Sequence, residues 1–304
     1  PRSMSDPRSL WHPVATSIDL PQHHIFHGQL LGREVAVWRA DDDFVNVWEN
    51  RCLHRGVRLS IGTNDGNELT CRYHGWRYAN RSAGCTYIPA HPADAPARTI
   101  CNRTFPAVER YGLVWSGEDP VGEPPLVPML DDGTPFTLRS LPVNASAEIV
   151  LAQLRDHRFQ PVGALDGDHA AMAVTELGDF ALALTATGAN YHSTAVFFVQ
   201  PVDSDRSVIR AVLTDTPADS EQIAVLRHHA TRLGQLVALA ETAAADQPAP
   251  EPMVATIDQV SLALSVMPER ETNRSAPLRV QVARKWETAH DIMAFELVST
   301  GNPL

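Results

Sequence analysis

The sequence predicts an α+β protein in which an all-β domain precedes a domain of antiparallel sheet and helices. Short alternating apolar and polar runs, punctuated by glycine and proline, fill the chain up to about Pro128. After the proline-rich segment Val121 to Pro128, alanine and leucine become more frequent, and strand-like runs precede one long helical pattern. We therefore expect a first domain at residues 4–128, a second at 129–270 and a terminal segment at 271–304.

Composition narrows the class of protein. The chain has 304 residues, of which 44% are apolar and 20% charged, enough to bury one large core or two ordinary ones. Its formal charge of −11 argues against nucleic acid and anionic membranes as partners. The sequence contains no apolar run of membrane-spanning length and no secretory signal, so we expect a cytoplasmic protein. Its four cysteines are more typical of an intracellular metal or redox site than of a disulfide scaffold.

A hairpin and three further short strands are predicted in the first domain. The run Val35 to Trp48 alternates apolar and polar residues around an acidic tip, which is typical of a half-buried hairpin. Similar short runs follow at Glu68 to Cys71, Gly75 to Tyr78 and Tyr111 to Trp115. Together they predict a small antiparallel β domain.

The second domain shows three strand-like runs, at Phe180 to Thr187, Tyr191 to Val202 and Ser207 to Thr214. A helix follows, which we expect Asp219 to cap, with Gln222 reciprocating, and which ends near Asp246. Antiparallel sheet and helix are therefore expected in this domain.

Beyond that helix, a shorter apolar stretch at Ile257 to Met267 predicts a second helix on the same sheet. Alternation returns from Leu278 onward, which predicts the opening strands of a further domain.

Two short loops carry the chemistry. The chain reads Cys52-Leu53-His54-Arg55-Gly56 and, with sixteen residues between His54 and the second loop, Cys71-Arg72-Tyr73-His74-Gly75-Trp76. A hairpin between the loops can bring them face to face, with two thiolates on one iron and two imidazoles on the other, which is a Rieske [2Fe-2S] centre. Arg55, Gly56, Tyr73, Gly75 and Trp76 are expected beside the ligands, and the two glycines let backbone amides approach the cluster.

Two other interpretations of the four ligand residues remain open. They can be ordinary buried side chains, or they can form a tetrahedral zinc site. Zinc sites favour pairs of like ligands, whereas each loop here contributes one cysteine and one histidine, so the [2Fe-2S] interpretation is favoured. Cys85 and Cys101 lie outside both loops and are expected to be buried thiols.

From about Leu10 to Asp119 the chain resembles the Rieske non-heme iron oxygenases, closest to the aromatic-ring hydroxylase and O-demethylase branch. The phrases LLGREVAVWRADD, RCLHRGVRLSIG, CRYHGWRYANRSAGCTYIPAHP and VERYGLVW carry this resemblance. It implies a Rieske domain followed by a helix-grip catalytic domain, usually assembled as a trimer. The respiratory Rieske proteins have an extra cysteine in each loop, where Val57 and Tyr73 stand here, which points away from that class.

The same resemblance implies that the catalytic domain opens with Asp, two residues, His, four residues and His. Those histidines, with a later carboxylate, bind mononuclear Fe(II). Here Asp156 matches the bridging Asp, but Phe159 and Ala164 stand where the two histidines belong. Neither side chain can bind iron, so we expect a degenerate, shortened catalytic domain without mononuclear iron. Asp156 is interpreted either as a surviving electron relay or as an ordinary helix carboxylate.

Other residues offer a relocated iron site, although no pair has the family spacing. They are His157, His169, His192, His228, His229 and Glu241. From Leu278 the chain resembles the start of a phthalate-dioxygenase-type reductase, whose flavin site would lie beyond residue 304; an unrelated terminal hairpin is the alternative.

These observations lead to one main hypothesis and two rivals. The main hypothesis is an oxidoreductase that passes electrons from a flavin reductase, fused or separate, through the cluster to a partner Rieske oxygenase subunit in a homo- or hetero-trimer. The first rival is an active monooxygenase or demethylase of a small aromatic substrate with a rearranged iron site. The second is a regulatory or structural subunit.

Overall fold

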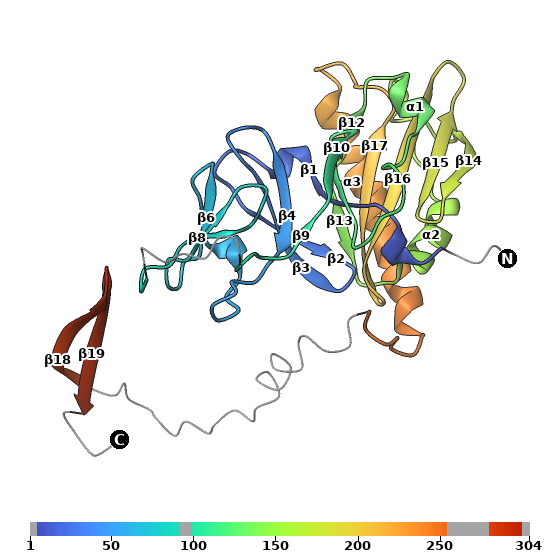
Figure 1. Cartoon of the computed structure of the whole chain (residues 1–304). Helices are drawn as coiled ribbons and strands as arrows, with labels where there is room; N and C mark the ends of the chain where they lie inside the picture. Colours follow the sequence, from blue (N-terminus) through green and yellow to red (C-terminus); the bar gives the residue numbers. More distant parts are fainter. Residues whose placement is uncertain (1–4, 92–98, 254–279, 300–304) are drawn as a thin grey trace.

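The computed structural model describes residues 5–91, 99–253 and 280–299. Within these ranges the protein is an α+β molecule built mainly from antiparallel sheets, as predicted (Figure 1). None of the helices found there has the length and apolarity needed to cross a membrane. The predicted helix at Ile257 to Met267 lies outside the described residues.

Three small sheets form the first domain. One has the order β2-β3-β4-β9, one β5-β6-β7-β8, and one β1-β11-β10. The strands are β1 (His12–Thr16), β2 (Phe26–Leu30), β3 (Arg33–Arg39), β4 (Val45–Glu49), β5 (Thr63–Asn64), β6 (Glu68–Thr70), β7 (Arg77–Ala79), β8 (Cys85–Tyr87), β9 (Thr104–Phe105), β10 (Ala107–Arg110) and β11 (Leu113–Ser116). Three 3-10 helices lie at Pro7–Ser9, Ser17–Asp19 and Leu59–Ile61.

The predicted hairpin is formed by β3 and β4, and both of its faces are buried. Val35 and Val37 belong to a core shared with β1 and β11, while Trp38 and Trp48 belong to the core beneath the two ligand loops. The two tryptophan rings meet edge to face, with centroids 5.1 Å apart. The expectation of a half-buried hairpin was wrong because the small β5–β8 sheet packs on the second face.

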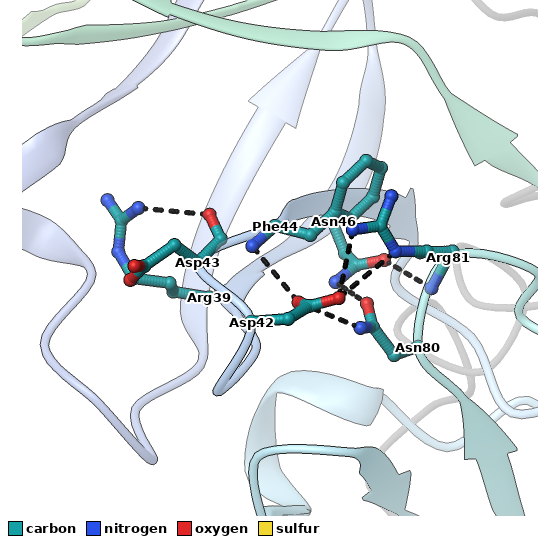
Figure 2. Close-up of polar contacts among 7 residues, drawn as sticks. All are labelled: Arg39, Asp42, Asp43, Phe44, Asn46, Asn80 and Arg81. Carbon is teal, nitrogen blue, oxygen red and sulfur yellow. Dashed lines mark hydrogen bonds and ion pairs between the residues drawn. The ribbon is translucent and has the colours of Figure 1, made fainter.

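Polar contacts also tie the β5–β8 sheet to this hairpin (Figure 2). The carboxylate of Asp42, at the hairpin tip, accepts hydrogen bonds from Asn80 Nδ2 at 3.0 Å and Arg81 Nη2 at 2.9 Å. The buried Asn46 donates to Asn80 Oδ1 at 2.8 Å and accepts from the Arg81 amide at 3.0 Å. The Arg81 guanidinium lies 4.2 Å from the centroid of the Phe44 ring. The turn between β7 and β8 is therefore held in place on the hairpin.

A six-stranded antiparallel sheet forms the second domain, in the order β12-β17-β16-β15-β14 with β13 beside β17. The elements are α1 (Pro128–Asp131), β12 (Phe136–Thr137), β13 (Leu141–Val143), α2 (Ala147–Arg155), β14 (Ala171–Gly178), β15 (Ala181–Thr187), β16 (His192–Asp203), β17 (Arg206–Leu213) and α3 (Gln222–Ala245). The three predicted strands are confirmed as β15, β16 and β17, whereas β14 and α2 were not predicted. Helices α2 and α3 cover one face of the sheet, and the other face packs on β10 and β11 (Figure 1).

Helix α3 has the predicted extent. Its buried residues are Val225, His229, Leu233, Leu236 and Ala240. The predicted capping was wrong: the N-cap is Glu221, which makes no side-chain capping hydrogen bond. Asp219 lies two residues further upstream, and its Oδ1 instead accepts from Gln222 Nε2 at 3.1 Å.

A buried arginine joins the two domains. Arg210 on β17 is 4% exposed, and its guanidinium donates to the carbonyls of Pro13 at 2.8 Å and Val14 at 2.9 Å, both on β1. It also donates to Ser140 Oγ at 2.8 Å and Gln200 Oε1 at 3.1 Å. Burial lowers the pKa of Arg210 to about 10, so the group remains a cation at neutral pH. The first strand of the chain is thus fastened to the sheet of the second domain.

The predicted terminal strands are present as the hairpin of β18 (Val280–Ala289) and β19 (Ile292–Ser299). Several large apolar side chains on it are exposed: Val280, Val282, Trp286, Met293, Phe295, Leu297 and Val298.

Candidate cluster-binding site

The two ligand loops have the same backbone closure. In the first, the Cys52 amide donates to the carbonyl of Val57 at 2.7 Å, and the Gly56 amide donates to the carbonyl of Cys52 at 2.8 Å. In the second, the Cys71 amide donates to the carbonyl of Trp76 at 2.8 Å, and the Gly75 amide to that of Cys71 at 3.0 Å. Each loop is therefore a closed turn that begins at its cysteine.

Each turn needs a glycine at its fifth position. Gly56 and Gly75 both have φ of +71°, the left-handed region in which a side chain is strained. Space is also limited at Gly75, because an added Cβ would lie 3.2 Å from Cγ of Pro89. Both glycines are therefore needed to close their turns, while their predicted role of letting backbone amides approach the cluster stays a prediction.

The two thiols lie together on the buried side of the loops. Cys52 and Cys71 are 3% and 2% exposed, and the Cys71 thiol hydrogen-bonds to the Cys52 sulfur. That contact, with the Tyr78 hydroxyl 3.2 Å away and the amides of His54 and Arg55, lowers the pKa of Cys52. The same contact, together with burial, raises the pKa of Cys71. Both cysteines bind metal in the thiolate form.

The two imidazoles lie on the outer side. The rings of His54 and His74 have centroids 4.6 Å apart with planes at 68°, and the His54 side chain is exposed. Trp76 stacks on His54 with centroids 4.9 Å apart and planes only 4° apart, while Tyr73 lies against His74 at 3.8 Å. The aromatic neighbours therefore hold both rings in defined orientations.

This donor set fits a Rieske [2Fe-2S] cluster. Two thiols meet on one side and two imidazoles on the other, and backbone amides point at the sulfurs. Such amide donors stabilise negative charge on sulfur. Cys52, Cys71, His54 and His74 are thus the residues that would hold the cluster.

Tyr78 is a site residue that the sequence interpretation missed. Its hydroxyl contacts Cys52 Sγ and accepts a hydrogen bond from the Leu53 amide at 3.1 Å, and the ring is fully buried. Burial and the neighbouring Cys52 raise the pKa of Tyr78, so it remains a neutral hydrogen-bond donor. The available signal was the aromatic pair Trp76 and Tyr78 directly after the second loop, since both pack in the core beneath the loops.

The remaining two cysteines differ from each other. Cys85 is fully buried, as predicted, but Cys101 is exposed, so that part of the prediction was wrong. Cys101 forms an isolated β-bridge with Gly84, the residue directly before Cys85. Because side chains alternate between faces along a strand, one thiol points into the core and the other outward.

In the second domain, the three positions implied by the family pattern lie at and after the end of α2. Asp156 is the C-cap of α2 and is exposed. Phe159 is 1% exposed and belongs to the main core of the domain, and Ala164 lies on the following loop, partly buried. The Phe159 ring contacts the ring of His229 on α3, with centroids 4.9 Å apart. Hydrocarbon therefore fills the space at Phe159 between α2, the sheet and α3.

Three histidines surround this phenylalanine. His228 Nε2 accepts a hydrogen bond from the Gln160 amide at 2.9 Å, while His157 Nε2 and His229 Nδ1 are buried without a hydrogen-bond partner among the described residues. Burial lowers the pKa of His157 to about 4 and that of His229 to about 3. Both rings are therefore neutral at neutral pH.

The other candidates for a relocated site lie apart. His169 and His192 are exposed, and Glu241 accepts hydrogen bonds from the backbone and side chain of Asn144, each at 3.0 Å. Within the described ranges, no group of three or more His, Cys, Asp and Glu side chains is arranged to hold a single metal ion. The four loop ligands do not form such a group, since a Rieske centre divides them between two irons.

Comparison with known proteins agrees with the first of these sites. The model of the Rieske [2Fe-2S] domain family matches residues 10–109, which contain all four loop ligands.

Curated relatives match part of the chain. The oxidoreductase NdmD of Pseudomonas putida is 45% identical over 154 residues, which is 48% of this chain and 26% of that protein. The methylxanthine N1-demethylase NdmA of the same organism is 39% identical over 114 residues, 36% of this chain and 32% of that protein. The chain thus spans about a quarter to a third of the length of these relatives.

Solved structures extend the likeness to the fold of both domains. A structure of dicamba monooxygenase matches 86% of this chain and 96% of its own, with a TM-score of 0.63 and 18% identity. A structure of the NdmA QL mutant of Pseudomonas putida with theobromine matches 85% of this chain and 88% of its own, with a TM-score of 0.58 and 22% identity.

Proposed function

Because this chain is a member of the Rieske non-heme iron oxygenases, we propose that it is the electron-transfer component of an oxygenase system and that its own mononuclear iron site has been lost. One contrast carries this proposal. The loops around Cys52 and Cys71 present a complete cluster-binding set, whereas a buried phenylalanine, Phe159, and Ala164 occupy the positions of the two iron histidines. The first domain is therefore equipped for electron transfer and the second serves as a scaffold.

Each part of the cluster site has a separate task in this proposal. The cluster, when bound, supplies one-electron transfer. The buried side, with Tyr78 and the loop amides, holds the two sulfurs away from water, and Trp76 orients His54. The exposed imidazole side is the face through which a partner approaches.

We further propose a flavin-dependent reductase as electron donor and a catalytic Rieske oxygenase subunit as acceptor. The named activity of the relative NdmD, an oxidoreductase, supports the first partner. The exposed apolar side chains of β18 and β19 support a donor domain fused to this chain, because a two-stranded hairpin alone is marginally stable. Asp156, exposed at the end of α2, would serve docking or relay in a mixed trimer. The four cysteines form no disulfide, which is consistent with a cytoplasmic location.

Metal analysis tests the proposal. The purified, oxygen-protected protein should contain about two irons and two acid-labile sulfides per chain, as a [2Fe-2S] centre requires. A third, separately removable iron whose removal abolishes activity would refute the loss of the mononuclear site. Colourless, iron-free protein would refute the cluster itself.

The two buried ring nitrogens beside Phe159 favour one alternative, an active monooxygenase or demethylase with a rearranged iron site. It predicts oxygen uptake coupled to product formation when this chain is the sole oxygenase subunit. The proposed function predicts turnover only with a partner oxygenase, and its loss when His54 is replaced. Unchanged partner turnover by His54→Ala would indicate a regulatory or structural subunit instead.

A further inference from the structure

The charge around the cluster loops is opposite to that of the whole chain. Segments 51–58 and 71–77 contain five arginines and no aspartate or glutamate, although the formal net charge of the protein is −11. Three of these arginines lie beside other groups: Arg58 pairs with Glu34 at 2.6 Å, Arg51 also interacts electrostatically with Glu34, and Arg77 lies over the ring of Tyr87. The charge of Arg55 and Arg72 remains at the loop surface, where both side chains are exposed.

Apolar side chains lie among these charges. Leu53 is 46% exposed and Tyr73 61% exposed, and both are next to a ligand histidine in the sequence. The cysteine side of the loops is buried, so the histidine side is the accessible route to the cluster among the described residues. A small apolar centre with a cationic rim is the usual composition of a transient protein contact.

We propose that the exposed end of the two loops, formed by Leu53, Arg55, Arg72 and Tyr73, is a docking face for an acidic electron-transfer protein. This inference rests on the proposed function and names the chemistry of the partner. The rest of the surface, which carries the negative charge, repels an acidic partner, while the arginine rim attracts it. The partner is therefore steered to the imidazole side, where the distance for electron transfer is shortest.

Two small redox ions of opposite charge test whether the surface around the cluster loops is positively charged. The dithionite-reduced protein gives one electron to ferricyanide, which becomes ferrocyanide, or to hexaammineruthenium(III), and stopped-flow absorbance follows the cluster. Added salt should slow oxidation by ferricyanide and accelerate oxidation by hexaammineruthenium(III), because the electron leaves through a cationic face. If the negative net charge of the protein governed the rates, salt would accelerate oxidation by ferricyanide and slow oxidation by hexaammineruthenium(III). That result would overturn the proposal.

A matched pair of charge reversals locates the effect. The double variant Arg55→Glu/Arg72→Glu should slow oxidation by ferricyanide about tenfold at low salt and invert the salt dependence. Arg227→Glu, on an exposed position of α3, should leave the rate within about twofold, since screening limits the reach of a distant charge. If the loop variant and the α3 variant changed the oxidation rate equally, the overall charge of the protein would explain the effect. That result would overturn the docking face.

Two further measurements identify the occupant. A reduced acidic plant-type ferredoxin should reduce the oxidised protein at a rate that falls with salt and falls about tenfold in the double variant. Calorimetry with hexacyanocobaltate(III), a redox-inert anion, should show binding to the parent protein and none to the double variant, and it requires no electron transfer.

A salt-sensitive self-association that the double variant abolishes, seen by analytical ultracentrifugation, would make a second copy of this chain the occupant and overturn the choice of partner. Protein without cluster absorbance would overturn the proposed function, whereas a cluster with salt-independent oxidation by both ions would overturn only the docking face.

Discussion

The histidines of the two domains differ in surroundings and in use. In the first domain, His54 and His74 stand side by side at the surface, held by closed backbone turns and by aromatic neighbours. In the second, His157 and His229 lie in the core against Phe159, and burial lowers the pKa of both. An imidazole becomes a metal ligand only where the backbone brings other donors to it; elsewhere it is packed as a neutral ring.

The largest expected effect follows from removing a cluster ligand. Cys71→Ser should abolish the bound iron and sulfide and bleach the visible absorbance, because one iron would lose one of its two protein thiolates. Cys101→Ser, at an exposed cysteine outside the loops, should retain both. Metal analysis and absorbance of the purified variants make the comparison, and a C71S protein with full iron content would contradict the assignment of the ligands.

The next effect concerns the second domain alone. Phe159→Ala should lower the free energy of unfolding by about 3–5 kcal/mol, because it leaves a cavity in the main core. Val174→Ala, on an exposed stretch of β14, should change it by less than about 0.5 kcal/mol. Urea unfolding followed by circular dichroism measures both. Loss of cluster absorbance in the folded F159A protein would show that the two regions are not independent.

The buried imidazoles should make stability depend on pH. Their pKa values are lowered on folding, so the unfolded chain binds more protons and stability falls as the pH drops below about 6.5. From pH 7 to pH 5 each buried histidine should cost about 2 kcal/mol. His229→Gln should reduce this slope by about half in urea titrations at several pH values, whereas His24→Gln, at an exposed histidine, should not. An unchanged slope in H229Q would mean that folding does not lower the pKa of His229.

The smallest effect tests the contacts between the hairpin and the β5–β8 sheet (Figure 2). Asn46→Ala should destabilise the protein by about 1–2 kcal/mol, since the side chain of Asn80 and the amide of Arg81 each lose a hydrogen-bond partner. Asp42→Ala should cost less, because its ion pair with Arg81 is exposed to solvent. Thermal unfolding of both variants compares their stabilities. A larger loss of stability in D42A than in N46A would show that the exposed Asp42, rather than the buried Asn46, contributes more to holding the β7–β8 turn on the hairpin.

The proximity of the four proposed ligands could be predicted from sequence because each loop is local. A cysteine, a histidine and a glycine within five residues define a turn whose closing hydrogen bonds stay inside the loop. The contact of Tyr78 with Cys52 and the exposure of Cys101 depend instead on which strands pair. The burial of the second face of the β3–β4 hairpin depends on the β5–β8 sheet, which follows the hairpin in the chain. Long-range packing of this kind leaves no mark on the local pattern.

The same distinction applies to the second domain. Its three long strands and α3 follow from periodicity, which is strong over such lengths. The proposal that Phe159 and Ala164 stand in place of iron ligands rests on resemblance, and the clustering of His157, His228 and His229 near Phe159 could be seen only in the fold.

The buried guanidinium of Arg210 makes the two domains depend on each other. It donates to the carbonyls of Pro13 and Val14, so deleting the second domain would leave both carbonyls without this donor. Deleting the opening strand would leave a buried cation with fewer acceptors. We therefore expect each domain to lose stability when the other is removed.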